Sequence, residues 1–255
     1  MIRRRENRAE RAPRLDTVLV ARGLAPSRAR AQDLIRRGLV EVAGAIERHP
    51  GTGVGASADI HVTGSAAGDA SRGAEKLRAA LDHFRFPVAD IVALDVGASA
   101  GGFTQVLLDR GAARVYAVDV GRGQLDARLA ADPRVISLQA CDARRLDRVL
   151  IPEPVGALVA DVSFISLTKA LPVPLSLASA GAWLVALIKP QFEAGRAAVG
   201  KGGIVRDPAA RQLAVEAVRD WVAHRPGWHV RGVIPSPIAG GSGNQEFLLG
   251  AVRDG

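Results

Sequence analysis

The chain has 255 residues, of which 48% are apolar and 24% charged, so it can bury a core, and its composition excludes a collagen-like, fully disordered or coiled-coil protein. A single cysteine, Cys141, excludes an internal disulfide and a multi-cysteine zinc site and fits a reducing cytoplasm, where we expect the protein to act. The net charge of +8 favours a polyanionic partner.

Most of the excess positive charge lies in the first 62 residues, which hold twelve arginines and seven acids. The pattern there predicts a flexible basic arm, two short helices and two short strands. We expect these elements at residues 1–13, 15–23, 27–38, 40–42 and 59–62. The second helix turns Leu34 and Ile35 inward and exposes Arg28, Arg30, Arg36 and Arg37. Residues 14–62 are thus expected to form a compact α+β module, and a charged surface without a partner is the alternative interpretation.

Small residues at 63–72 predict a linker, and the pattern changes after it. Across 73–255, apolar runs of strand length alternate with helical stretches. We expect strands at 91–96, 114–118, 135–138, 157–160, 183–188, 228–234 and 246–252, and helices at 102–110, 124–131, 166–178 and 207–224. Such alternation predicts an α/β domain with a doubly wound, mostly parallel, Rossmann-like sheet of seven strands.

Residues 170–188 carry no charge and are long enough to span a membrane. Pro172, Pro174 and Gly181 break this stretch into a helical piece and a strand. We therefore expect no membrane segment.

The clearest local motif is residues 94–104, LDVGASAGGFT, which is typical of a strand, a small-residue loop and a helix start. Glycines there let a ligand approach the backbone, and the amides at the helix start can bind an anionic group. The next strand ends at Asp119, whose carboxylate can accept both hydroxyls of a ribose, and Asp142 after the third strand can bond an adenine amino group.

These features predict an adenosine-containing cofactor. Asp95 at the strand end would repel a pyrophosphate but can lie near the amino group of S-adenosylmethionine, which we therefore favour over a dinucleotide. A structural turn without a ligand is the alternative. The expected cofactor-binding residues are Asp95, Gly97, Ala98, Ser99, Gly101, Gly102, Phe103, Asp119, Asp142 and Asp161.

The chain contains thirty arginines and four lysines, Lys76, Lys169, Lys189 and Lys201. A buried lysine can lose its proton and act as a base, whereas an arginine cannot. Lys189 and Asp161 end neighbouring strands at the carboxyl edge of the predicted sheet, Glu246 opens the last strand and Lys76 begins the helix before the sheet. Each residue alone is typical of a cap or a surface charge, but together they predict a catalytic site beside the cofactor loop.

Six motifs occur in the order found in a known family: SRGAEKL (71–77), DVGASAGGFT (95–104), DVSFISL (161–167), KPQFE (189–193), GGIVRDP (202–208) and GNQEF (243–247). From Arg14 to about Val252 the chain resembles the TlyA-type ribosomal RNA cytidine 2′-O-methyltransferases, also called haemolysin A-like proteins, and more distantly the FtsJ-like methyltransferases. The front module is similar to the S4 RNA-binding domain, marked by Arg14-Leu15-Asp16 and Ser27-Arg28.

The resemblance implies that residues 73–255 form a class I methyltransferase domain and that Lys76, Asp161, Lys189 and Glu246 form a catalytic tetrad with Lys189 as the base. The implied reaction is 2′-O-methylation of cytidine in 16S or 23S ribosomal RNA by S-adenosylmethionine, without a metal. RNA rather than DNA is expected because the reaction needs a 2′-hydroxyl. We expect phosphate contacts from Arg14, Arg28, Arg30, Arg36, Arg37 and Arg72.

Ribosomal RNA or ribosomal subunits are the expected partners, and we expect a monomer or weak dimer that does not bind membranes. An aromatic content of 4% favours recognition of folded RNA over stacking on a free strand. Three alternatives stay open: a non-catalytic RNA-binding or ribosome-assembly protein, a membrane-damaging protein and an NAD-dependent oxidoreductase.

Overall fold

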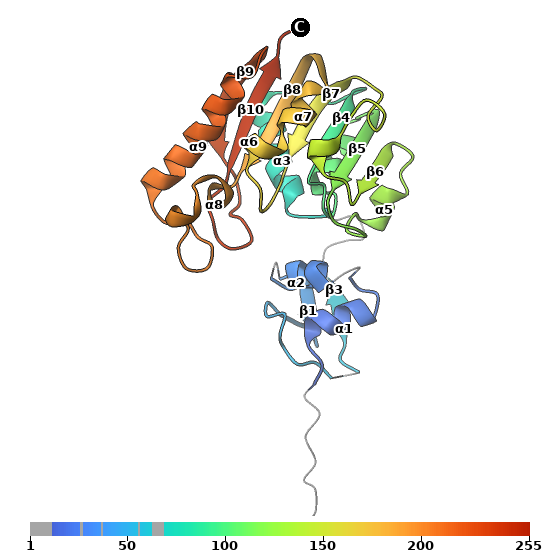
Figure 1. The fold of residues 1–255 in the computed structure, drawn as a ribbon. Coiled ribbons are helices and arrows are strands. Elements are labelled where there is room, and N and C mark those ends of the chain that lie inside the picture. The colour runs from blue at the N-terminus through green and yellow to red at the C-terminus, as the bar shows by residue number, and fades with distance from the viewer. Residues whose placement is uncertain (1–11, 26–27, 37, 56, 63–68) are drawn as a thin grey trace, which may run out of the picture. The chain divides into compact units, whose positions relative to one another are not determined.

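The computed structural model describes residues 12–25, 28–36, 38–55, 57–62 and 69–255 (Figure 1). The chain forms two compact units, Met1–Gly68 and Asp69–Gly255. The predicted basic arm (apart from its last two residues), residues 63–68 of the predicted linker, the capping residue Ser27, Arg37 and the side chain of Arg30 lie outside what the structure describes.

The first unit packs two helices against a small antiparallel sheet. Its elements are α1 (Leu15–Ala21), α2 (Arg28–Arg36), β1 (Val40–Val42), β2 (Ala45–Ile46) and β3 (Ile60–Val62), and the strand order is β2-β1-β3. Strand β2 was not predicted, because two residues are too few to show an alternating pattern. A turn with positive φ at Ala43 (52°) and Gly44 (82°) joins it to β1, as tight hairpins require.

The second unit carries a seven-stranded sheet with the order β6-β5-β4-β7-β8-β10-β9 (Figure 1). Its strands are β4 (Val92–Val96), β5 (Arg114–Asp119), β6 (Val135–Gln139), β7 (Val155–Ala160), β8 (Ala178–Ile188), β9 (Trp228–Pro235) and β10 (Phe247–Arg253). Only β10 runs antiparallel to its neighbours, β8 and β9. This mostly parallel sheet confirms the predicted Rossmann-like fold.

Helices cover both faces of the sheet, because alternate residues of each strand enter different apolar clusters. The helices are α3 (Gly73–Phe84), α4 (Gly102–Asp109), α5 (Ala127–Ala130), α6 (Leu167–Ala170), α7 (Pro172–Ser176), α8 (Pro190–Glu193) and α9 (Pro208–Ala223), with 3₁₀ turns η1 (Ala143–Arg145) and η2 (Arg196–Ala198). On β4, Leu94 and Val96 belong to a cluster with α6, α7 and α9, whereas Ala93 belongs to a cluster with α3, α4 and α5.

Two expectations about these elements were wrong. The helix expected at 166–178 is two short helices, α6 and α7, because Pro172 can begin a helix but cannot continue one. Strand β8 begins at Ala178, five residues before its expected start, because Ala178 pairs with Val155 of β7. Over the part of the chain that the structure describes, no helix has the length and apolarity needed to cross a membrane.

Candidate active site

The loop between β4 and α4 owes its glycines mainly to close packing. Gly97 has φ +87°, and a Cβ there would lie 2.5 Å from the backbone oxygen of Asp161. At Gly101, with φ +93°, a Cβ would meet the side chain of Leu129 at 2.3 Å, and at Gly102 it would meet Ser71 Oγ at 2.0 Å. The loop therefore has to bend tightly between its neighbours, which leaves its outer side open to a ligand.

A groove of about 750 Å³ runs along the carboxyl ends of β4, β5 and β7. Five of the predicted cofactor residues line it: Gly97, Ser99, Asp119, Asp142 and Asp161. The other five do not, and Phe103 departs most from the expectation, because this residue is 3% exposed and packs in the apolar cluster around α3 and α4. Phe103 is thus a core residue in this structure, and the same is true of its neighbour Val106.

Two acids on the groove wall are held by neighbouring donors. Asp119 accepts hydrogen bonds from the backbone N–H of Ser99 (2.8 Å) and of Gly121 (2.7 Å). Asp142 accepts from Nε and NH2 of Arg144, at 3.0 and 2.6 Å, and this contact lowers the pKa of the Asp142 carboxyl to about 2. The Asp142 carboxylate is therefore ionised at neutral pH. Hydrogen bonds fix both side chains in orientation where the sheet edge meets the groove.

Asp95 lies behind the groove wall formed by Val96 and Gly97 and is fully buried. Its Oδ2 accepts a 2.7 Å hydrogen bond from Thr104 Oγ1, while Oδ1 has no hydrogen-bond partner among the described residues. Burial raises the pKa of the Asp95 carboxyl to about 7, and the hydrogen bond from Thr104 opposes that rise. A buried carboxylate with one unsatisfied oxygen favours a positively charged ligand nearby.

A second pocket, of about 320 Å³, adjoins the groove and shares Ser163 and Phe164 with it. Lys189 lines this pocket directly after β8. Its Nζ lies 2.6 Å from Asp161 Oδ1 and 2.8 Å from Ser163 Oγ. The Asp161–Lys189 pair therefore lies at the junction of the two hollows, with the acid on one side and the amine on the other.

The other two residues of the predicted tetrad form a second ion pair. Lys76 Nζ lies 2.5 Å from Glu246 Oε2, and the two residues are 7% and 3% exposed. Lys76 lies in the first turns of α3, which begins at Gly73 rather than at Lys76 as expected, and Glu246 lies directly before β10. Glu246 also lines the second pocket, so all four residues approach one edge of the sheet in two pairs.

Two family models match the chain: an FtsJ-like methyltransferase over residues 70–253 and an S4 domain over residues 13–60. The 16S/23S rRNA (cytidine-2′-O)-methyltransferase TlyA of Mycobacterium tuberculosis strain H37Rv is 48% identical over 94% of this chain and 89% of its own length. This chain belongs to the TlyA family of FtsJ-like methyltransferases.

Two further relatives support the same assignment. Hemolysin A of Brachyspira hyodysenteriae is 38% identical over 92% of this chain and 98% of its own length. A solved structure of a candidate hemolysin from Streptococcus thermophilus is 38% identical, covers 96% of this chain and 90% of its own, and superimposes with a TM-score of 0.74. The resemblance of the sequence to the TlyA family is therefore confirmed.

Nothing in the sequence indicated an aromatic pair with one exposed ring, yet this TlyA-family chain has one at the site. Phe164 is 91% exposed at a backbone φ of +66° and lines the groove, the second pocket and a third hollow of about 620 Å³. Its ring centroid lies 5.2 Å from that of Phe192. Overall aromatic content could not reveal this pair, although both residues lie within the 161–167 and 189–193 motifs.

Two polar residues that sequence reasoning missed hold the loops around this TlyA-family site. Asn244 is 2% exposed, accepts from Val205 N–H at 3.0 Å and donates to the Gly203 carbonyl at 2.7 Å. Glu193 accepts from Ser166 Oγ (2.6 Å) and from Leu167 N–H (2.8 Å). Burial raises the pKa of Glu193 above its usual range. These bonds fix the loop that bears Phe164 and the one before α9.

The arginines expected to bind RNA have varied surroundings. Arg72 donates to the backbone carbonyl of Ala239 at 2.7 Å, which gives it a structural contact within the methyltransferase unit. Arg14 and Arg28 contact Asp16, and Arg36 contacts Gln32, all within the S4 unit. In the described residues, no cluster of three or more metal-binding side chains could hold a metal ion.

Proposed function

We propose that this protein transfers the methyl group of S-adenosylmethionine to the 2′-hydroxyl of a cytidine in ribosomal RNA. The observation that supports this best is the Asp161–Lys189 pair, which joins a groove of cofactor size to a second pocket beside an exposed aromatic ring. The family relative from M. tuberculosis carries that activity in its name. Ribosomal subunits in the cytoplasm are the substrate that this proposal requires.

The groove residues fit S-adenosylmethionine in charge and size. A volume of about 750 Å³ is within the range of ordinary small-molecule sites. Asp119 ends β5, where Rossmann-like folds bind a ribose, and the unsatisfied oxygen of Asp95 favours a cation rather than a pyrophosphate. When bound, S-adenosylmethionine supplies an electrophilic methyl group on a positively charged sulfur.

The second pocket suits a nucleoside with its ribose near Lys189. The exposed face of Phe164 offers a surface on which a nucleobase can stack, as single-stranded bases do on aromatic side chains in RNA-binding proteins. Glu246 on the pocket wall can accept a hydrogen bond from a ribose hydroxyl while its other contact is Lys76. A target nucleotide turned out of its RNA helix would meet all of these groups.

Lys189 takes the proton that the 2′-hydroxyl loses. Its amine can serve as a base only in the neutral form. The positively charged sulfur of S-adenosylmethionine, once bound in the adjoining groove, favours that neutral form. Asp161 and Ser163, at 2.6 and 2.8 Å, direct the Nζ atom toward the junction of groove and pocket. Asp161 is thus an orienting group, and the buried Lys76–Glu246 pair fixes the far side of the pocket.

The test is methyl transfer from labelled S-adenosylmethionine to purified ribosomal subunits that lack the modification, with label in the ribose as the readout. Lys189→Ala should reduce the rate by at least about 10²-fold, the usual contribution of a general base, while binding of S-adenosylmethionine stays near wild type. Lys189→Arg is the matched control for charge, because it can keep the ion pair with Asp161 but cannot lose a proton.

The Arg variant should be as inactive as the Ala variant. Substantial activity of Lys189→Arg would mean that Lys189 contributes only charge, and loss of cofactor binding in both would mean that it is structural. Absence of label on both subunits and on free ribosomal RNA, with cofactor binding intact, would favour a non-catalytic RNA-binding protein instead.

A further inference from the structure

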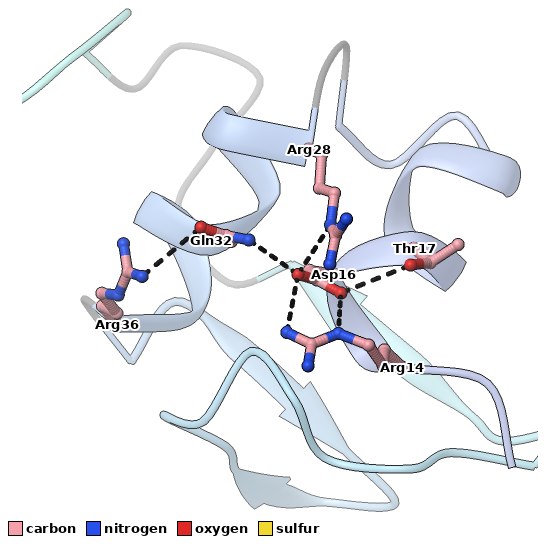
Figure 2. A network of polar contacts seen from close by, with 6 residues as sticks. All are labelled: Arg14, Asp16, Thr17, Arg28, Gln32 and Arg36. Atoms are coloured by element: carbon pink, nitrogen blue, oxygen red, sulfur yellow. Dashed lines mark hydrogen bonds and ion pairs between the residues drawn. The ribbon is translucent and has the colours of Figure 1, made fainter. Parts of the chain in front are cut away.

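A buried carboxylate lies at the centre of a polar network in the S4 unit (Figure 2). Asp16, on the first turn of α1, is 0% exposed although it is an acid in an arginine-rich module. Arg14 donates to both of its oxygens, from Nε at 3.0 Å and from NH2 at 3.1 Å. Arg28 donates from Nε at 3.0 Å, and Gln32 donates from Nε2 at 2.8 Å.

This network keeps the buried Asp16 carboxylate ionised. A buried carboxylate is unfavourable unless charges and hydrogen bonds compensate it, and here two guanidinium groups and one amide do so. The hydrogen bond from Arg14 holds the pKa of the Asp16 carboxyl well below its usual range, although burial acts in the opposite direction. Asp16 therefore keeps its negative charge throughout the physiological pH range.

Arg14 and Arg28 each contact Asp16 with part of the guanidinium group, and about half of each side chain stays exposed to solvent. The side chains of Arg14 and Arg28 are 49% and 59% exposed, whereas that of Asp16 is fully buried. Each guanidinium has five N–H donors, so both have donors beyond those that face the carboxylate. Gln32 extends the network to a third arginine, because its Oε1 accepts from Arg36 NH2 at 3.4 Å (Figure 2).

These residues come from separate parts of the unit. Arg14 directly precedes α1, Arg28 begins α2 and Arg36 ends it. Free arginine side chains at such places would sample many rotamers, and each would have to be ordered when it bound a phosphate. The contacts with Asp16 restrict two of them before any ligand arrives.

We propose that Asp16 is a positioning residue for RNA binding, which holds Arg14 and Arg28 as a preset pair for the phosphates of one stretch of RNA backbone. This inference rests on the proposed function, since it needs RNA to be the partner of the S4 unit. Asp16 is buried and touches no phosphate itself, and it acts through the two guanidinium groups.

The proposal predicts an effect opposite in sign to simple electrostatics. An acid near a phosphate-binding surface repels RNA, so its removal should tighten binding if charge alone mattered. If Asp16 positions the arginines, its removal loosens them and binding weakens despite the more positive charge. Asp16→Asn has nearly the same shape, removes the charge and replaces one of the two acceptor oxygens with an N–H donor, which makes it the decisive variant.

Binding of the full-length protein to purified ribosomal subunits would be measured over a range of salt concentrations. Asp16→Asn should weaken binding by about fivefold or more and flatten the dependence of log K on log salt, as expected when phosphate contacts are lost. Glu41→Gln on β1 is the matched control, because it removes one acid from the same unit outside the network and should bind as well as wild type or better.

A thermal melt and circular dichroism would show whether the S4 unit of each variant is folded. If Asp16→Asn is folded and binds as tightly as wild type or more tightly, the proposal is overturned. If it is unfolded, Gln32→Met decides, since that change leaves the charge unaltered but removes the bonds to Asp16 and Arg36. At least about twofold weaker binding by Gln32→Met would support the proposal, and unchanged binding would overturn it.

Failure of the proposed function gives a different result. In that case the wild-type protein itself would not bind ribosomal subunits or free ribosomal RNA in a salt-dependent manner. A wild type that binds and methylates RNA, together with a folded Asp16→Asn variant that binds equally well, would contradict the role of Asp16 alone.

Discussion

Gly97→Ala should damage the site through its neighbour Asp161. The new Cβ would lie 2.5 Å from the Asp161 oxygen, 3.0 Å from its carbonyl carbon and 3.3 Å from Val162 Cα. Ordinary contact begins at 3.4 Å, so the closest atom is 0.9 Å too near, and all three atoms belong to the backbone. Because backbone cannot rotate aside, Asp161 and the loop after it have to shift, and Lys189 loses its 2.6 Å contact.

The expected magnitude has two parts. An L residue in the left-handed region, here at φ +87°, costs about 1–2 kcal/mol, and the forced contact adds about 1–3 kcal/mol. We therefore expect the free energy of unfolding to fall by roughly 2–5 kcal/mol. A displacement of a catalytic group by about 1 Å can lower the rate about 10²-fold, and we expect a loss of that order in kcat/KM for methyl transfer.

Gly123→Ala is the matched control for this prediction. Gly123 also has positive φ, at +63°, but no heavy atom lies within 4 Å of the position that a Cβ would take there. It should lose only about 1–2 kcal/mol of stability and keep nearly full activity. Urea unfolding and initial rates of methyl transfer measure both quantities, and the reasoning would be refuted if the two alanine variants behaved alike.

Two further predictions concern buried charges. Because burial raises the pKa of Asp95 to about 7, the folded state retains a proton that the unfolded chain releases. The stabilisation of the folded state by this proton is full below the ordinary carboxyl pKa and is lost as the pH rises to about 7. Between pH 5 and pH 7 the wild type should lose at most about 3 kcal/mol of stability relative to Asp95→Asn, and parallel stability curves from chemical denaturation at each pH would contradict this. Removing one member of the buried pair, by Lys76→Met or Glu246→Gln, should cost about 3–5 kcal/mol, whereas the double variant should regain most of the stability and none of the activity. Denaturation and methyl-transfer assays of the three variants test whether stability returns without activity. A double variant with restored activity would show that the pair is only structural.

Much of the methyltransferase unit was predictable because its signals are local. Runs such as residues 91–96 and 114–118 are apolar on both faces, which only a strand covered by helices on both sides needs. Asp207 before Pro208 predicted the start of α9, and its side chain does accept from the amides of Ala209 and Ala210. The β8 extension was missed because strand pairing with β7 is not local. The split of α6 from α7 has a local cause, Pro172, which begins the second helix.

Exposure of individual side chains was the part that the sequence could not predict. Phe103 in the cofactor motif is buried, whereas Phe164 in another motif is 91% exposed, and nothing in the flanking residues distinguishes the two. Asp16 is buried although acids on short amphipathic helices usually face solvent. Burial of a side chain depends on which distant elements pack over it, and those elements are brought there by the fold.

The amino-acid sequence alone carries the alternating α/β pattern, the glycine loop, the concentration of arginine near the N-terminus and the resemblance that implies the tetrad. The pairing of the residues in this predicted tetrad depends on the fold. Lys76 and Glu246 are 170 positions apart, and Lys189 meets Asp161 because parallel strands β7 and β8 end at the same edge of the sheet. Contacts over such separations follow from strand order and helix packing, which no local pattern encodes.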